Sequence, residues 1–163
     1  MTAAAGWRSK PVLAAALSAT AVGLLGMLTT ELSTWYFNLH KPAWQPPDWL
    51  FGPVWTTIFA LAALAGVLYW KHVEDREARL RVQAAFIANA FLNTLWSLLF
   101  FRLKRPDLAL DEVGFLWLSI VVLIVLLRAG SRTAALLIVP YLAWVSFAAY
   151  LNYTIVQLNQ PFH

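Results

Sequence analysis

Long apolar stretches alternate with short charged segments along this chain. Each stretch is about 20 residues long, the length that a helix needs to cross a hydrocarbon core of roughly 30 Å. The pattern predicts five membrane-spanning helices, at residues 11–30, 51–70, 81–101, 108–128 and 133–157. The predicted fold class is therefore all-α, with residues 1–163 forming a single five-helix transmembrane bundle.

The segments between the predicted spans differ in length and character. Residues 102–107 and 129–133 are short, so the helices that they join run antiparallel. The charged run 71–81 alternates in sign and is interpreted as a solvated helix end or turn. Residues 12–30 exceed the usual 7–15-residue core of a signal peptide and end in LTTE, so they are expected to be a retained first span.

Composition supports a membrane protein and excludes several other classes. Apolar residues make up 61% of the chain and charged residues 12%, against about 45–50% and about 25% in soluble domains. Cysteine is absent, which excludes disulfides and thiolate metal sites. No metal-ligand cluster or resident cofactor is expected. The net charge of +4 gives no support to nucleic-acid binding, because Lys and Arg flank membrane spans for topological reasons.

The basic residues predict how the bundle is oriented. One side of the membrane would hold Arg8, Lys10, Lys71, Arg76, Arg79, Arg81, Arg128 and Arg132. The opposite side would hold Lys41, Arg102, Lys104 and Arg105. Because basic residues concentrate on the cytoplasmic side, the first side, which includes the N-terminus, is predicted to face the cytoplasm. Residues 31–50 would then face outward.

Residues 41–55, KPAWQPPDWLFGPVW, are unusually rich in proline and tryptophan. Proline fixes its own φ and forces the preceding residue into extended geometry, so KPAWQPP is predicted to be non-helical and stiff. Two interpretations of the nearby rings remain open. They could form the aromatic belt at a membrane surface, or residues 31–50 could form an ordered lid over the open end of the bundle. We call residues 31–50 the lid segment. Its rings are those of Trp35, Tyr36, Trp44 and Trp49.

Helix geometry places further aromatic and amide residues beneath the lid segment. At about 1.5 Å per residue, Trp55 would lie roughly 6 Å, and Phe59 and Asn93 roughly 12 Å, below the lid-side ends of their spans. Trp96, Trp144, Ala148 and Asn152 fall in the same half of the bilayer. Such a set could line a pocket for a flat apolar ligand. Equally, the rings could pack on one another while Asn89 or Asn93 hydrogen-bonds across helices.

The lid segment also carries the motif W-Y-x-x-L-x-K-P-x-W-x-P-P-x-W, spanning Trp35 to Trp49. This motif resembles the first loop of the translocator protein family, also called tryptophan-rich sensory proteins or peripheral-type benzodiazepine receptors. GPVW ending at Trp55, the stretch from Asn89 to Trp96, ALDE at 109–112, and PYLAW with the following Asn152 extend the likeness over nearly the whole chain.

The resemblance implies a five-helix bundle, usually a homodimer, in a bacterial-type member of the family. It implies binding of porphyrins, sterols and synthetic benzodiazepine-type ligands in a pocket closed by the first loop. The ligand-contacting positions fall here on Tyr36, Trp55, Phe59, Asn93, Trp96, Trp144 and Ala148. A small-residue pair, Ala84 and Ala88, could form a dimer contact or pack within the bundle.

Among these ligands the sequence favours a porphyrin. The sterol motif of animal members needs a basic residue soon after a tyrosine, but Tyr153 is followed by TIVQLNQPFH, which has none. Indole rings could stack on the macrocycle, and Lys41, Arg102, Lys104 and Arg105 could pair with its propionates. Because His40, His72 and His163 lie outside the predicted spans, no axial haem ligand is expected and the metal-free form is favoured.

The sequence thus predicts a membrane receptor or sensor for porphyrin-like tetrapyrroles, with two alternatives. The first is a transporter of porphyrins or sterols, although no inverted repeat is visible and ionisable residues deep in the spans are not expected. The acidic pair Asp111 and Glu112 is attributed to interfacial solvation or helix-dipole pairing. The second is a light-dependent porphyrin-degrading enzyme, in which the resemblance makes Trp55 and Trp144 the candidate catalytic residues.

Overall fold

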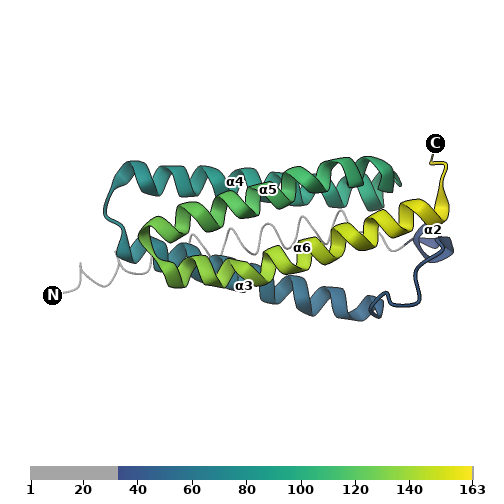
Figure 1. The fold of residues 1–163 in the computed structure, drawn as a ribbon, viewed down its shortest axis with the longest axis horizontal. Coiled ribbons are helices and arrows are strands. Elements are labelled where there is room, and N and C mark those ends of the chain that lie inside the picture. The colour runs from purple at the N-terminus through teal and green to yellow at the C-terminus, as the bar shows by residue number, and fades with distance from the viewer. Residues whose placement is uncertain (1–32, 163) are drawn as a thin grey trace.

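The computed structural model describes residues 33–162, and the predicted first span at 11–30 lies outside this range. Over the described range the regular structure is helical, without strands (Figure 1). The helices are α2 (Thr34–Asn38), α3 (Asp48–His72), α4 (Arg76–Ser97), the π-helical turn η1 (Leu98–Arg102), α5 (Pro106–Gly130) and α6 (Arg132–Asn159).

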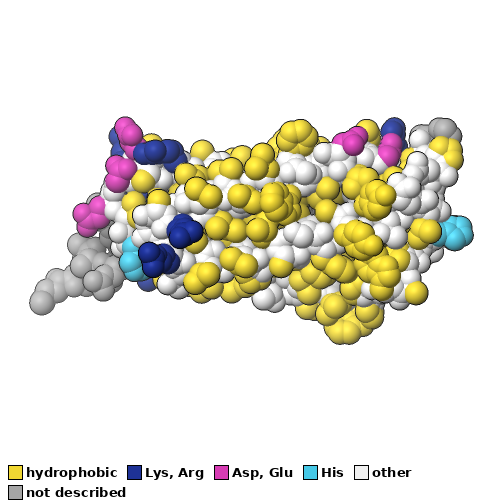
Figure 2. Space-filling view, in the orientation of Figure 1, with side chains coloured by type: hydrophobic (Ala, Val, Ile, Leu, Met, Phe, Trp, Pro, Cys, Tyr) yellow, Lys and Arg dark blue, Asp and Glu magenta, His cyan; other side chains and the backbone are white. Residues whose placement is uncertain are grey.

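Four of the described helices are long and apolar enough to cross a membrane. They are α3, α4 extended by η1, α5 and α6, with 25, 27, 25 and 28 residues and a mean hydropathy between 1.6 and 2.4. In Figure 2, charged side chains gather at the two ends of the visible face and leave an apolar middle. Such a surface suits a bilayer, so the protein is an integral membrane protein.

Polar caps explain why some helices begin at residues other than those predicted. Helix α4 begins at Arg76, five residues before the predicted start of the third span near residue 81. The Asp75 side chain accepts hydrogen bonds from the backbone N–H groups of Glu77 and Ala78, at 3.3 and 2.9 Å, and so caps the helix. Only Ser131 separates α5 from α6, and its hydroxyl caps α6 at Ala134 N.

Part of the lid segment is more helical than predicted. Residues 34–38 form α2, and α3 begins at Asp48 rather than near residue 51. Pro47 stands at the N-cap position of α3, and the Asp48 carboxylate in the first turn suits the positive end of the helix dipole. Residues 39–47 are not helical, as the prolines predict.

The π-helical turn η1 is a feature that hydropathy could not reveal. At its end the backbone N–H of Leu103 donates to the carbonyl of Leu98, five residues earlier, at 2.9 Å. A π-bulge inserts an extra residue into a helical turn and thereby rotates the side chains that follow. Here it presents Phe100 and Phe101 to the aromatic rings described below.

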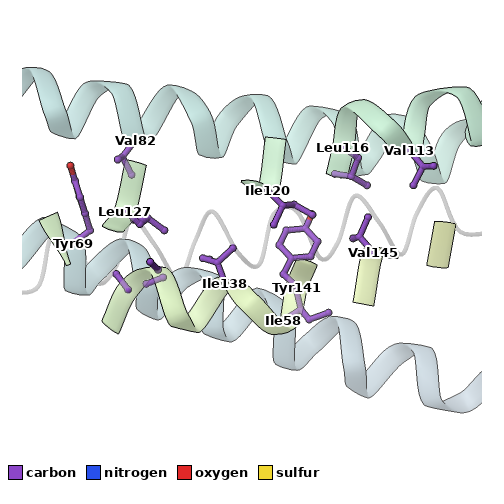
Figure 3. Packing of buried hydrophobic residues seen from close by; sticks show 13 residues of the cluster. Ile58, Tyr69, Val82, Val113, Leu116, Ile120, Leu127, Ile138, Tyr141 and Val145 are labelled. Carbon is purple, nitrogen blue, oxygen red and sulfur yellow. The ribbon is translucent and has the colours of Figure 1, made fainter. Parts of the chain in front are cut away.

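The core lies along the inner faces of the long helices. Helix α5 packs against α6 and α4, and α3 packs mainly against α6. Figure 3 shows the side chains converging between these helices; the labelled ones are Ile58, Tyr69, Val82, Val113, Leu116, Ile120, Leu127, Ile138, Tyr141 and Val145. At the end opposite the lid segment, Gly130 allows α5 to approach Tyr69 and Val73 closely.

Candidate functional site

A polar contact inside the bundle joins three of the predicted binding residues. Asn93 Nδ2 donates to the Tyr141 hydroxyl at 3.1 Å, and both residues are buried. The Tyr141 ring meets Trp55 edge-on, with 5.9 Å between ring centroids, and Trp55 stacks on Phe59 at 5.4 Å. Tyr141 therefore links Trp55, Phe59 and Asn93 into one cluster. Sequence reasoning missed it, although it belongs to the PYLAW stretch.

A second aromatic cluster joins Tyr36 of α2 to Trp96 of α4. Trp96 stacks on Phe100 at 5.2 Å and meets Phe101 edge-on at 6.1 Å. Phe101 also contacts the Tyr36 ring, at 5.6 Å. The phenylalanines of η1 thus bridge two predicted binding residues that do not themselves form a ring pair among those described. Hydropathy gave no reason to expect this bridge.

Trp144 lines a groove between α3 and α6. The groove has a volume of about 500 Å³ and a mostly apolar lining that consists of Pro53, Val54, Thr57, Ile58, Leu61, Pro140, Ala143, Trp144 and Phe147. Trp144 also packs against Phe51 and Phe147, with centroid separations of 5.5 and 5.3 Å. Its buried indole N–H has no hydrogen-bond partner within residues 33–162. Ala148 lies one helical turn further along α6 and is half-buried.

The seven predicted binding residues therefore do not line a single cavity among the described residues. They lie in two aromatic clusters and along one groove. Trp55, Phe59 and Asn93 share one cluster, Tyr36 and Trp96 share another, and Trp144 lines the groove. Rings packed on one another and an apolar groove thus occur in the same half of the molecule. A flat apolar ligand could contact this half by parting stacked rings or by entering from the groove.

Polar contacts hold the part of the lid segment that precedes α3 against Asp48, the first residue of that helix. The Tyr36 hydroxyl donates to Asp48 Oδ1 at 2.8 Å, and Gln45 Nε2 donates to the same oxygen at 3.1 Å. Lys41 Nζ lies 3.6 Å from the centroid of the Tyr36 ring and 4.0 Å from Asp48 Oδ2. Burial, reinforced by the hydrogen bond and charge of Asp48, raises the pKa of the Tyr36 phenol. Tyr36 therefore remains a hydrogen-bond donor at neutral pH.

Further contacts attach the lid segment to α6. Trp44 stacks on Tyr150 with 5.2 Å between centroids and meets Phe147 edge-on at 5.9 Å. Asn159 Oδ1 accepts from His40 N, and Asn159 Nδ2 donates to His40 O, both at 2.8 Å. Trp49, in contrast, has 72% of its surface exposed, which suits the interfacial-belt interpretation for that ring.

Two of the cations proposed as propionate partners already have acidic neighbours. Lys41 pairs with Asp48, as described above. Arg105 Nε donates to both carboxylate oxygens of Asp107, at 2.8 and 3.2 Å. An incoming carboxylate would therefore compete with these pairs, and Lys41, in the lid segment, is the cation nearest the Tyr36 ring.

Buried amides connect the helices elsewhere in the bundle. Asn89 Nδ2 donates to Ser119 Oγ at 2.8 Å, which joins α4 to α5. With its amide oriented to satisfy both groups, Asn152 donates to Pro106 O and accepts from Leu110 N, each at 3.1 Å. These contacts match the expected use of amides as interhelical hydrogen-bonding groups.

Glu112 is a buried acid that sequence reasoning assigned to the wrong environment. The interpretation of interfacial solvation is wrong, because only 7% of the residue is exposed. Neither carboxylate oxygen has a hydrogen-bond partner within residues 33–162. Helical periodicity explains the difference: Glu112 shares the inward stripe of α5 with Ala109, Val113 and Leu116, while Asp111 points outward and is exposed.

Comparison with known proteins places these features in context. The model of the TspO/MBR family matches residues 12–158. The chain is 45% identical over 145 residues to the tryptophan-rich protein TspO of Chlorobaculum tepidum, covering 85% of this chain and 89% of that protein. It is 36% identical over 125 residues to the tryptophan-rich sensory protein of Cereibacter sphaeroides, covering 77% of each. It is 32% identical over 126 residues to the human translocator protein, covering 77% and 75%.

Proposed function

Because the chain belongs to the TspO/MBR family and is an integral membrane protein, we propose that it is a membrane receptor for porphyrin-like tetrapyrroles. In this proposal a flat apolar macrocycle binds in the half of the bundle that lies next to the lid segment. Binding there would report tetrapyrrole levels to the cell, in keeping with the sensory role that the name of one relative states.

The concentration of aromatic rings beside the lid segment is the observation that supports this proposal. Trp44 stacks on Tyr150, Trp55 on Phe59 and Trp96 on Phe100, with centroid separations of 5.2 to 5.4 Å. Aromatic faces stack favourably on other π-systems, and a tetrapyrrole presents a large π-face. Polar groups among them, such as Asn93 and Tyr141, would orient the macrocycle.

The lid segment would close the site from the aqueous side. Its contacts with Asp48, Tyr150 and Asn159 give it a defined position, and ligand entry from water would require some of them to break. Lys41 would pair with a propionate at the water boundary in exchange for Asp48. By the distribution of basic residues, this side of the membrane would face away from the cytoplasm.

A homodimer is also part of the proposal. Ala84 and Ala88 lie one turn apart on an exposed face of α4, beside Ile87 and Phe91, which are 71% and 65% exposed. Small residues at this spacing allow two membrane helices to approach closely. Replacement of Ala88 by Leu should shift purified protein toward monomer in cross-linking and size measurements. An unchanged dimer fraction would exclude this face.

The proposal is tested by titrating the purified protein with protoporphyrin IX. Tryptophan quenching is followed in the dark and porphyrin absorbance under light, for wild type, Trp144→Phe and the exposed control Trp49→Phe. Saturable quenching supports a tetrapyrrole site, and its absence would overturn the proposal and direct attention to sterols and other lipids.

Light-dependent behaviour and vesicle uptake separate the receptor from its alternatives. Porphyrin loss under light in wild type and Trp49→Phe, but not in Trp144→Phe, would identify the degrading enzyme. Uptake of labelled porphyrin into vesicles that contain the protein would identify a transporter. Saturable binding with neither behaviour is the result expected of a receptor.

A further inference from the structure

Glu112 has a position that its surroundings do not explain. It is the seventh residue of α5, which puts it roughly 9 Å below the lid-side end of that helix. The residue is 7% exposed, and both carboxylate oxygens are shielded. Acids inside membrane bundles are costly and normally pair with another group, but none of the residues 33–162 donates a hydrogen bond to Glu112.

Polar groups nearby are already engaged in other hydrogen bonds. Asn93 donates to the Tyr141 hydroxyl. On the side of α4 facing α5, Asn89 donates to Ser119, whose hydroxyl donates to Leu116 O. The neighbouring acid, Asp111, is exposed and has no role in this arrangement. A donor for Glu112 from outside the described residues would therefore complete the cluster without breaking an existing bond.

The place of Glu112 relative to the aromatic rings suggests what this donor is. Leu116, one helical turn beyond Glu112 on the inward face of α5, packs in the same buried cluster as Tyr141 and Trp55, and Tyr141 contacts both Asn93 and Trp55. The acid thus lies beside a buried cluster that contains predicted binding residues. We propose that Glu112 is a specificity-determining residue whose carboxylate accepts hydrogen bonds from the central N–H groups of a metal-free tetrapyrrole. This inference rests on the proposed function.

The role of Glu112 can be tested by comparing two porphyrins that differ in their central N–H groups. A free-base porphyrin has two N–H groups at its centre, whereas its palladium(II) complex has none. Palladium(II) is square planar, so the complex offers no axial position for a carboxylate. A hydrogen bond to a buried acceptor that otherwise has no partner stabilises the bound state, because the acceptor is already removed from water. Glu112 should therefore favour the free base by about tenfold in affinity.

The experiment measures dissociation constants for both compounds with the full chain in detergent, in the dark, by tryptophan quenching. The proteins are wild type, Glu112→Met and Asp111→Asn. Methionine keeps an unbranched side chain of similar length but removes the acceptor oxygens, and an apolar replacement suits a buried position. Wild type and Asp111→Asn should bind free-base protoporphyrin IX about tenfold more tightly than its palladium(II) complex. In Glu112→Met this ratio should fall to about one.

Several results would overturn the inference while leaving the proposed function intact. One is equal affinity of wild type for the two porphyrins, which needs no variant and so does not depend on the folding of Glu112→Met. Another is an affinity ratio that survives in Glu112→Met. A third is weaker binding of both porphyrins by the same factor, which would indicate a structural role. If wild type binds neither porphyrin, the proposed function itself fails.

Discussion

Asn159 and His40, which are 119 residues apart, exchange two hydrogen bonds of 2.8 Å between the Asn159 amide and the His40 backbone. The amide satisfies both the N–H and the C=O of one lid-segment residue, as a neighbouring β-strand would. Asn159 Nδ2 also donates to Ile155 O within α6, which fixes the direction of the side chain. The end of α6 therefore holds the lid segment in place.

Replacing Asn159 by Ala should loosen the lid segment. Two neutral hydrogen bonds are lost, each contributing about 0.5–1.5 kcal/mol, so we expect the open population to rise by about tenfold. Chymotrypsin cleavage after Phe37 or Trp44 should accelerate accordingly, provided that opening is fast relative to cleavage. Gln157→Ala, at an exposed position on the same helix end, is the matched control. Equal cleavage of both variants would exclude the His40 contact as a restraint.

Tyr36→Phe should weaken a second attachment of the lid segment, the hydrogen bond between Tyr36 and Asp48. The substitution keeps the ring against Phe101 but removes the hydroxyl that donates to Asp48. Because Asp48 keeps the bond from Gln45 and the ion pair with Lys41, we expect a loss of about 1–2 kcal/mol. Thermal unfolding in detergent measures it.

The contribution of Tyr36 to the stability of the folded protein should decrease at high pH. The pKa of the phenol is higher in the folded protein than in the unfolded chain. This stabilisation is fully present below the ordinary tyrosine pKa of about 10 and is lost as the pH rises beyond it. The difference in stability between wild type and Tyr36→Phe should thus shrink in alkali, and a difference that grows would contradict this assignment.

Within residues 33–162 the sequence predicted the four apolar helices well, because hydropathy and length are decisive in a membrane. It predicted their starting residues less well. Local side chains set those: Asp75 extended α4 backward by five residues relative to the predicted start near residue 81. The turn η1 had no sequence signal, since Leu98–Arg102 reads as a continuation of an apolar helix.

The candidate site was predictable only in its broad position. Depth along each helix correctly indicated that Trp55, Phe59 and Asn93 lie near one another. It could not reveal Phe101 as the bridge between Tyr36 and Trp96, because the π-turn sets the direction of that ring. Nor could it distinguish Glu112 from Asp111, since adjacent residues on a helix differ by 100° in direction and the inward face depends on packing.

Gly130→Ala should destabilise the bundle at the end opposite the lid segment. A Cβ at this position would lie 2.6 Å from Tyr69 Cε2 and would overlap Val73 Cγ2. Overpacking of this kind costs about 1–3 kcal/mol, and the unfolding temperature should fall by several degrees. Gly114→Ala on the same helix is the control, because no atom of residues 33–162 lies within 4 Å of its added Cβ. A stable Gly130→Ala protein would mean that the ends of α3 and α5 separate at little cost.

Ala148→Leu should weaken binding of protoporphyrin IX without unfolding the protein. Ala148 is half-buried on α6, one turn beyond Trp144, so a larger side chain would fill space beside the rings that are expected to contact the macrocycle. Added methylenes at a packed surface cost about 1–3 kcal/mol, which corresponds to a loss of affinity of about 5- to 150-fold. Ala129→Leu, at an exposed position near the end of α5 opposite the lid segment, makes the same change away from the proposed site and should bind as wild type does. If Ala148→Leu keeps wild-type affinity in the dark quenching titration, the ligand lies elsewhere, and the groove beside Trp144 and Pro140 becomes the next position to block.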